Sequence, residues 1–145
     1  MTQVIISHLL IIAGFIIGLG AVTVIDLHGF LGRKLNYWTE ATTRTHKVTK
    51  PLIWIGTTLF VIGFLLLYRE ALLLVQIIIA TVMILNGLFL SFSVSPFLLK
   101  REKEGRQSEL LPRSWQNKIT ISFIISFLSW WGSVVLFVFF LNNII

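Results

Sequence analysis

Four long apolar runs constrain this chain more than any other feature of its sequence. They cover residues 4–31, 51–68, 71–99 and 119–141, and each approaches or exceeds the roughly 20 residues that an α-helix needs to cross a bilayer. Lipid offers no partner to an edge amide, so helices are expected and open strands are excluded. Hydrophobic residues make up 56% of the 145-residue chain and charged residues 12%, which leaves too little polar surface for a soluble domain. The sequence predicts an all-α, polytopic membrane protein, with residues 1–145 forming one four-helix transmembrane bundle.

The Lys and Arg residues predict how this bundle is oriented. All 12 of them except Arg69 fall between the apolar runs, in the expected loops at about 32–50 and 100–118. Short loops rich in Lys and Arg stay in the cytoplasm, so we expect both loops inside the cell and both termini outside. The expected location is the inner (plasma) membrane. Basic residues beside membrane spans attract anionic lipid and need no further explanation, so a nucleic-acid partner is not expected.

Several classes of site and segment are excluded or disfavoured. The chain has no cysteine, which excludes disulfides and thiolate metal sites. Residues 1–7 carry no Lys or Arg and no small-residue cleavage site follows, so the first run is expected to remain as a helix. The GxSxG, P-loop, GxGxxG and HExxH patterns of soluble enzymes are absent.

Small residues mark the helix faces that we expect to pack together. Gly14 and Gly18 form a GxxxG pattern in the first run, and Gly56 and Gly63 lie a heptad apart in the second. Such residues let two backbones approach closely in lipid, which predicts packing within the chain, with homodimerisation as the alternative. The fourth run places four serines on one face, and that face is also expected to contact a neighbour: Ser122, Ser126, Ser129 and Ser133.

Prolines affect where two of these helices begin or end. Pro51 suits the first turn of a helix, so the second helix either starts near Lys50 or is longer and kinks at the proline. Pro96 is expected to end the third helix.

Ionisable side chains within the spans are the candidate functional residues, because burying them is costly unless they are paired. Asp26, His28, His46 and Lys50 converge at the cytoplasmic end if the first two helices are neighbours. The structural alternatives are pairing of Asp26 with Lys50 or Arg33, and solvated interfacial histidines.

His8 stands nearly alone among Leu and Ile near the outer end of the first helix. A neutral imidazole is a common ligand for heme iron as well as for zinc or copper. His8 is therefore the leading candidate metal ligand (heme iron), with His28 and His46 as a possible second cofactor-binding site. The alternatives for His8 are a role as a proton relay and a simple side-chain hydrogen bond. Asn86, near mid-depth, is expected to bond a neighbouring helix.

The order of these residues resembles a known family. The chain has an early His8, then Gly18 ten positions later, His28 at the inner end, a His46-Lys47-x-x-Lys50-Pro51 entry to the second helix, and Arg113-x-x-x-Asn117 before the fourth. This layout is similar to the four-helix heme-associated membrane family, which includes bacterial membrane protoporphyrinogen oxidases and relatives of the copper-resistance D proteins. The chain departs from that pattern in lacking a Trp between His8 and Gly18, and in having Lys118 where a carboxylate is expected.

The resemblance implies heme b binding and, if the chain is an enzyme, an oxidoreductase of the protoporphyrinogen oxidase type. The first functional hypothesis is therefore membrane redox or porphyrin chemistry. The alternative is a non-catalytic membrane scaffold, either a homo-oligomer or a subunit of a larger membrane complex.

Overall fold

The computed structural model describes residues 2–67 and 70–142, and these residues form four long helical rods. Two of the rods are single α-helices, and the other two each contain a short π-helical segment between α-helices. The first rod consists of α1 (Thr2–Gly14), η1 (Phe15–Leu19) and α2 (Gly20–Leu31), and the second is α3 (Asn36–Leu67). The third rod consists of α4 (Glu70–Phe89), η2 (Leu90–Val94) and α5 (Ser95–Lys103), and the fourth is α6 (Arg113–Leu141). Each rod is long and apolar enough to cross a membrane, which confirms the predicted all-α membrane bundle.

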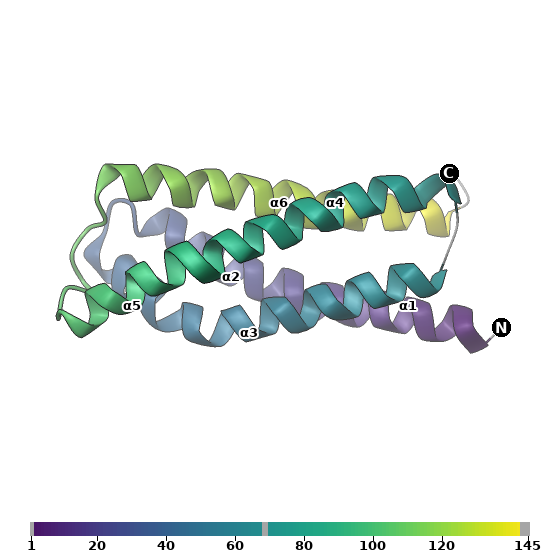
Figure 1. Cartoon of the computed structure of the whole chain (residues 1–145), viewed down its shortest axis with the longest axis horizontal. Coiled ribbons are helices and arrows are strands. Elements are labelled where there is room, and N and C mark those ends of the chain that lie inside the picture. Colours follow the sequence, from purple (N-terminus) through teal and green to yellow (C-terminus); the bar gives the residue numbers. More distant parts are fainter. Residues whose placement is uncertain (1, 68–69, 143–145) are drawn as a thin grey trace.

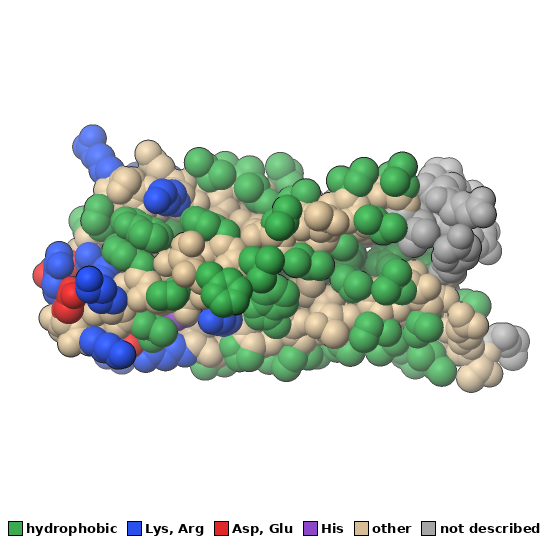
Figure 2. All heavy atoms as spheres, in the orientation of Figure 1, with side chains coloured by type: hydrophobic (Ala, Val, Ile, Leu, Met, Phe, Trp, Pro, Cys, Tyr) green, Lys and Arg blue, Asp and Glu red, His purple; other side chains and the backbone are tan. Residues whose placement is uncertain are grey.

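The rods form one bundle in which each packs against two neighbours. The first rod lies against α3, the third rod lies against α6, and contacts of α2 with α6 and of α3 with α4 complete the ring. Figure 1 shows that α1 begins and α6 ends at the same end of the bundle. Lys and Arg side chains gather at the opposite end, while apolar side chains cover the middle (Figure 2). This separation agrees with the predicted orientation, which remains a prediction. The predicted outer turn at Tyr68 and Arg69 lies outside the described residues.

The prediction of a loop over residues 32–50 is wrong, because α3 already begins at Asn36 and passes through Pro51. The early part of α3 buries a stripe of short polar residues at helical spacing rather than an apolar stripe: Thr39, Thr42, Thr43, His46 and Thr49. All four of these threonine hydroxyls donate to the carbonyl four residues earlier, as Thr42 does to Trp38 at 2.7 Å. These bonds satisfy the hydroxyls inside the helix itself. The longer helix with an internal proline was the second of the two predicted alternatives.

The third and fourth rods also extend further than predicted. The third rod continues past Pro96 to Lys103, because the proline occupies the first turn of α5, where its missing N–H is tolerated. The rod ends in a Schellman motif: Gly105 has a φ of +72°, and the Arg106 N–H donates to the Arg101 carbonyl at 2.8 Å. The α6 helix begins at Arg113, so much of the predicted loop 100–118 is helical.

The side chain of Arg101 organises the connection between α5 and α6. It is only 5% exposed, and one guanidinium nitrogen lies within hydrogen-bonding distance of the backbone carbonyls of Arg106, Glu109 and Leu110. Next to it, the rings of Phe97 and Trp115 stack with centroids 3.9 Å apart. A buried cation bound to three carbonyls gives this connection a fixed shape.

Glycines let the first rod and α3 approach backbone to backbone. A Cβ on Gly56 would lie closer than 3.0 Å to the Cα and N of Gly18, and one on Gly14 would lie 2.8 Å from the Gly56 carbonyl oxygen. Gly63 similarly faces the backbone of Ile11, and nearby the Ser7 hydroxyl donates to the Gly63 carbonyl at 2.7 Å. The predicted packing of these glycines within the chain is therefore confirmed.

Polar contacts join the third rod to α6. The Asn86 amide donates to the Ser126 hydroxyl at 2.8 Å and to the Ser122 carbonyl at 3.2 Å, and accepts from the Ser122 hydroxyl at 2.8 Å. All four serines of the predicted α6 face are buried, including Ser133, which is fully buried. The predicted interhelical role of Asn86 is confirmed.

Candidate functional site

A cavity of about 80 Å³ lies toward the basic end of the bundle, between α2, α3, the third rod and α6. Its ionisable lining residues are Asp26, His46 and Lys50, and its hydroxyl-bearing lining residues include Thr42, Thr49, Ser91, Ser95 and Ser122. The π-helical segment η2 supplies part of the wall, including Ser91. π-helical turns inside α-helices are frequent at functional sites, and here the segment lines the same cavity as the three ionisable groups.

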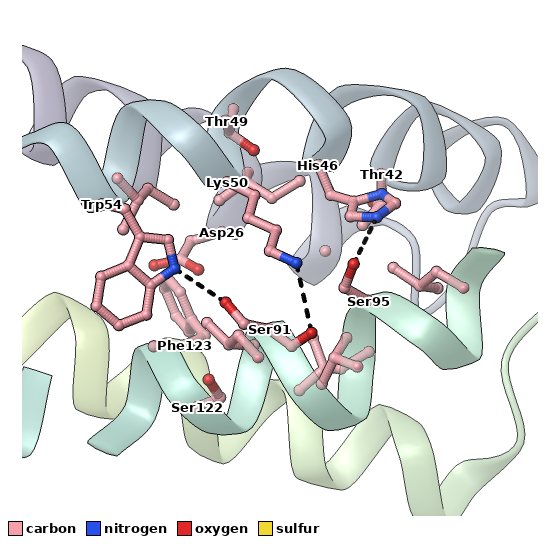
Figure 3. Close-up of a pocket in the computed structure, with 18 residues that line it drawn as sticks. Asp26, Thr42, His46, Thr49, Lys50, Trp54, Ser91, Ser95, Ser122 and Phe123 are labelled. Atoms are coloured by element: carbon pink, nitrogen blue, oxygen red, sulfur yellow. Dashed lines mark hydrogen bonds between the residues drawn. The ribbon is translucent and has the colours of Figure 1, made fainter. Parts of the chain in front are cut away.

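His46 is held in one orientation by both ring nitrogens. Its Nδ1 lies 2.6 Å from the Thr43 carbonyl oxygen, and its Nε2 lies 3.2 Å from the Ser95 hydroxyl (Figure 3). A carbonyl only accepts, so Nδ1 carries the proton and Nε2 accepts from Ser95. His46 would therefore have to release Ser95 before Nε2 could bind a metal.

Lys50 and Trp54 extend from α3 toward the same turn of η2. The Lys50 ammonium lies 3.5 Å from the Ser91 carbonyl oxygen, and the Trp54 indole N–H donates to the Ser91 hydroxyl at 3.0 Å. Figure 3 shows the Lys50 amine and the His46 ring both directed toward the third rod. One face of α3 thus places a cation, an imidazole and an indole against a single neighbouring helix.

Asp26 is the unpaired group of the cavity. Its Oδ2 atom is buried and has no hydrogen-bond partner among the described residues. It forms no ion pair with any described residue, so neither expected partner, Lys50 or Arg33, neutralises it. An unpaired carboxylate within a membrane span is costly to maintain, which marks Asp26 as a functional candidate.

The predicted cluster at this end of the bundle forms only in part. Asp26, His46 and Lys50 line one cavity as predicted. His28 does not line it and lies instead beside Trp38, with ring centroids 5.1 Å apart. The Nδ1 atom of His28 is buried without a hydrogen-bond partner in the described part of the chain.

His8 lies toward the opposite end of the first rod. Its Nε2 is buried and finds no hydrogen-bond partner among residues 2–67 and 70–142. Two rings of α6 flank it, with centroid distances of 5.8 Å to Phe137 and 6.3 Å to Phe140. The structure therefore gives this nitrogen no hydrogen bond within the described part of the chain.

The size of the cavity limits what it binds. A volume of about 80 Å³ has room for a few water molecules, whereas pockets for drug-sized ligands measure roughly 300–1,000 Å³. A porphyrin does not fit there. Within the described residues, no three His, Cys, Asp or Glu side chains come together as a metal site would require, although a heme needs only one or two protein ligands.

Sequence reasoning missed the residues of the third rod that complete the site. Ser91 and Ser95 are spaced by four, which places them on one helix face, and this spacing was the available signal. Trp54 gave none, because nothing in the sequence shows that it faces Ser91.

Comparisons with protein families, with curated proteins and with solved structures found no match to this chain. The functional inference therefore depends on the arrangement of its own residues.

Proposed function

We propose that this membrane protein binds a b-type heme, with His8 as an axial ligand. The observation that carries the proposal is the buried, unpartnered Nε2 of His8 in an apolar part of the bundle. A buried polar nitrogen without a partner is unfavourable, and coordination of iron would satisfy it. The family-like order of His8, Gly18 and His28 along the first rod also supports the proposal.

The aromatic side chains beside His8 support the proposal. The rings of Phe137 and Phe140 flank the imidazole and exclude water from it. A bound heme supplies one-electron redox chemistry, and this would make the protein a component of membrane redox or porphyrin metabolism. His28 is the candidate for a second site, because its Nδ1 is also unpartnered in the described chain, whereas both nitrogens of His46 are already engaged.

The test is an absorption spectrum of the detergent-solubilised protein after expression with ample heme. We expect a Soret band that His8→Ala removes and that His46→Gln, the matched control, leaves unchanged. A wild-type protein without a Soret band would refute the proposal. A band that survives His8→Ala but not His28→Ala would move the ligand to His28.

A second candidate function is a non-catalytic subunit of a membrane complex. It is favoured by the contacts of Asn86 with Ser122 and Ser126, because these polar groups satisfy one another without a cofactor. The glycines of the GxxxG pattern are used inside the chain, so a partner would need a different surface. This function predicts that His8→Leu leaves folding intact and leaves the protein in the same complex, as judged by co-purification and size-exclusion chromatography.

A further inference from the structure

We propose that the groove between α2 and α6 is a binding site for a lipophilic organic cation, with Asp26 as its counter-ion. The groove measures about 330 Å³, which reaches the range of pockets that hold drug-sized ligands, roughly 300–1,000 Å³. It is lined by residues of η1, α2 and α6, and several of them are exposed on the outside of the bundle. The proposal concerns a different place from the His8 site, since 18 residues of helix separate His8 from Asp26, about 27 Å along the axis.

The Asp26 side chain borders both the inner cavity and the outer groove. Its Oδ2 has no partner among the described residues, so the chain itself leaves this acceptor unused. The inner cavity is also lined by Lys50 and His46. A ligand cation in that cavity would therefore lie near the positive charge of Lys50. The side chains that line the groove are mostly apolar and include no Lys or Arg, which makes the groove the favourable approach.

The walls of the groove suit a cation with an apolar body. Four aromatic side chains form a continuous ladder along it, with successive ring centroids 6.0, 6.1 and 6.2 Å apart: Phe30, Phe123, Phe127 and Trp131. Aromatic faces attract cations, and the attraction is stronger where water is excluded.

The chain already uses the end of this ladder to hold a cation. The guanidinium carbon of Arg33 lies 4.3 Å from the centroid of the Phe30 ring, and the same side chain donates to the Thr120 hydroxyl at 3.3 Å. The rest of the ladder faces outward, since Phe127 and Trp131 are 49% and 43% exposed. A carboxylate oxygen without a partner in the described chain, beside exposed aromatic rings, is complementary to a diffuse, weakly hydrated positive charge. Such a ligand would reach the groove from the bilayer.

The experiment compares two ions of the same shape and opposite charge on the purified full-length protein. The protein is placed in phosphatidylcholine nanodiscs, and the binding of radiolabelled tetraphenylphosphonium and of tetraphenylborate is measured above that of empty nanodiscs. We expect saturable binding of the phosphonium with one site per chain, and no saturable binding of the borate. Asp26→Asn should weaken phosphonium binding at least tenfold, while Glu102→Gln, which removes a carboxylate paired with Lys47 outside the groove, should leave it unchanged.

A second pair of variants keeps the proposal testable if Asp26→Asn does not fold. Thr23 lines the groove, and its hydroxyl donates to the Leu19 carbonyl of the same rod, so Thr23→Phe fills the groove without changing the carboxylate. Val24 is its neighbour, is 45% exposed, and does not line the groove. We expect Thr23→Phe to weaken phosphonium binding at least tenfold and Val24→Phe to leave it unchanged. Equal binding of the two ions, or equal effects of these two variants, would overturn the proposal.

Discussion

Substitution of Gly56 by alanine tests the central packing contact of the bundle. The added Cβ would lie closer than 3.0 Å to the Cα and N of Gly18 and 2.9 Å from the carbonyl oxygen of Gly14. These neighbours are backbone atoms, so no side-chain rotation relieves the overlap and the two rods must separate. Overpacking of this kind costs about 1–3 kcal/mol, and the better helix propensity of alanine returns at most about 1 kcal/mol.

The matched control is Gly132→Ala on α6, where an added Cβ meets nothing within 4 Å. That variant gains helix propensity without overlap, so we expect it to be as stable as the parent protein or up to about 1 kcal/mol more stable. Both free energies of unfolding are measured by titrating the protein in mild detergent with sodium dodecyl sulfate and following the loss of native structure by tryptophan fluorescence. We expect Gly56→Ala to unfold at a clearly lower denaturant fraction than Gly132→Ala. Equal midpoints would show that the first rod and α3 do not approach as closely as described.

Two further predictions concern polar contacts. Asn86→Leu removes the hydrogen bonds to Ser122 and Ser126, and it should lower the free energy of unfolding by about 1–2 kcal/mol, in line with interhelical hydrogen bonds in membranes. Ser93 is exposed, so Ser93→Ala is the control, and an equal effect of the two substitutions would contradict the role of Asn86. Arg101→Gln leaves the carbonyls of the connection between α5 and α6 without their shared donor. Limited trypsin digestion in detergent should therefore cut this connection several-fold faster in Arg101→Gln than in the control Lys103→Gln. Equal cleavage rates would count against the role of Arg101.

The sequence predicted the existence of the four rods better than the residues at which they begin and end. Long apolar runs identify spanning helices because lipid forces every backbone group to bond within its own segment. The start of α3 was missed because its buried face consists of threonines and His46, so apolar periodicity gave no signal there. The continuation beyond Pro96 was missed because a π-helical segment precedes the proline and places it in the first turn of α5.

The sequence predicted which ionisable residues form the candidate site, but not which of them form ion pairs or hydrogen bonds. Asp26, His46 and Lys50 were expected to come together, and they line one cavity. Asp26 has no ion-pair partner among the described residues. This depends on the side-chain directions of three different rods, and no spacing in one sequence determines those directions. The same is true of the ladder from Phe30 to Trp131, in which one ring of α2 meets three rings of α6.

Cysteine accessibility in intact cells tests the central claim most directly, namely that four helices span the membrane with the basic end inside. The chain has no native cysteine, so Arg69→Cys and Lys103→Cys each introduce a single thiol. We predict that a membrane-impermeant maleimide labels the Arg69→Cys variant from outside, and labels the Lys103→Cys variant only after the membrane is permeabilised. Labelling of the Lys103→Cys variant in intact cells would contradict the account.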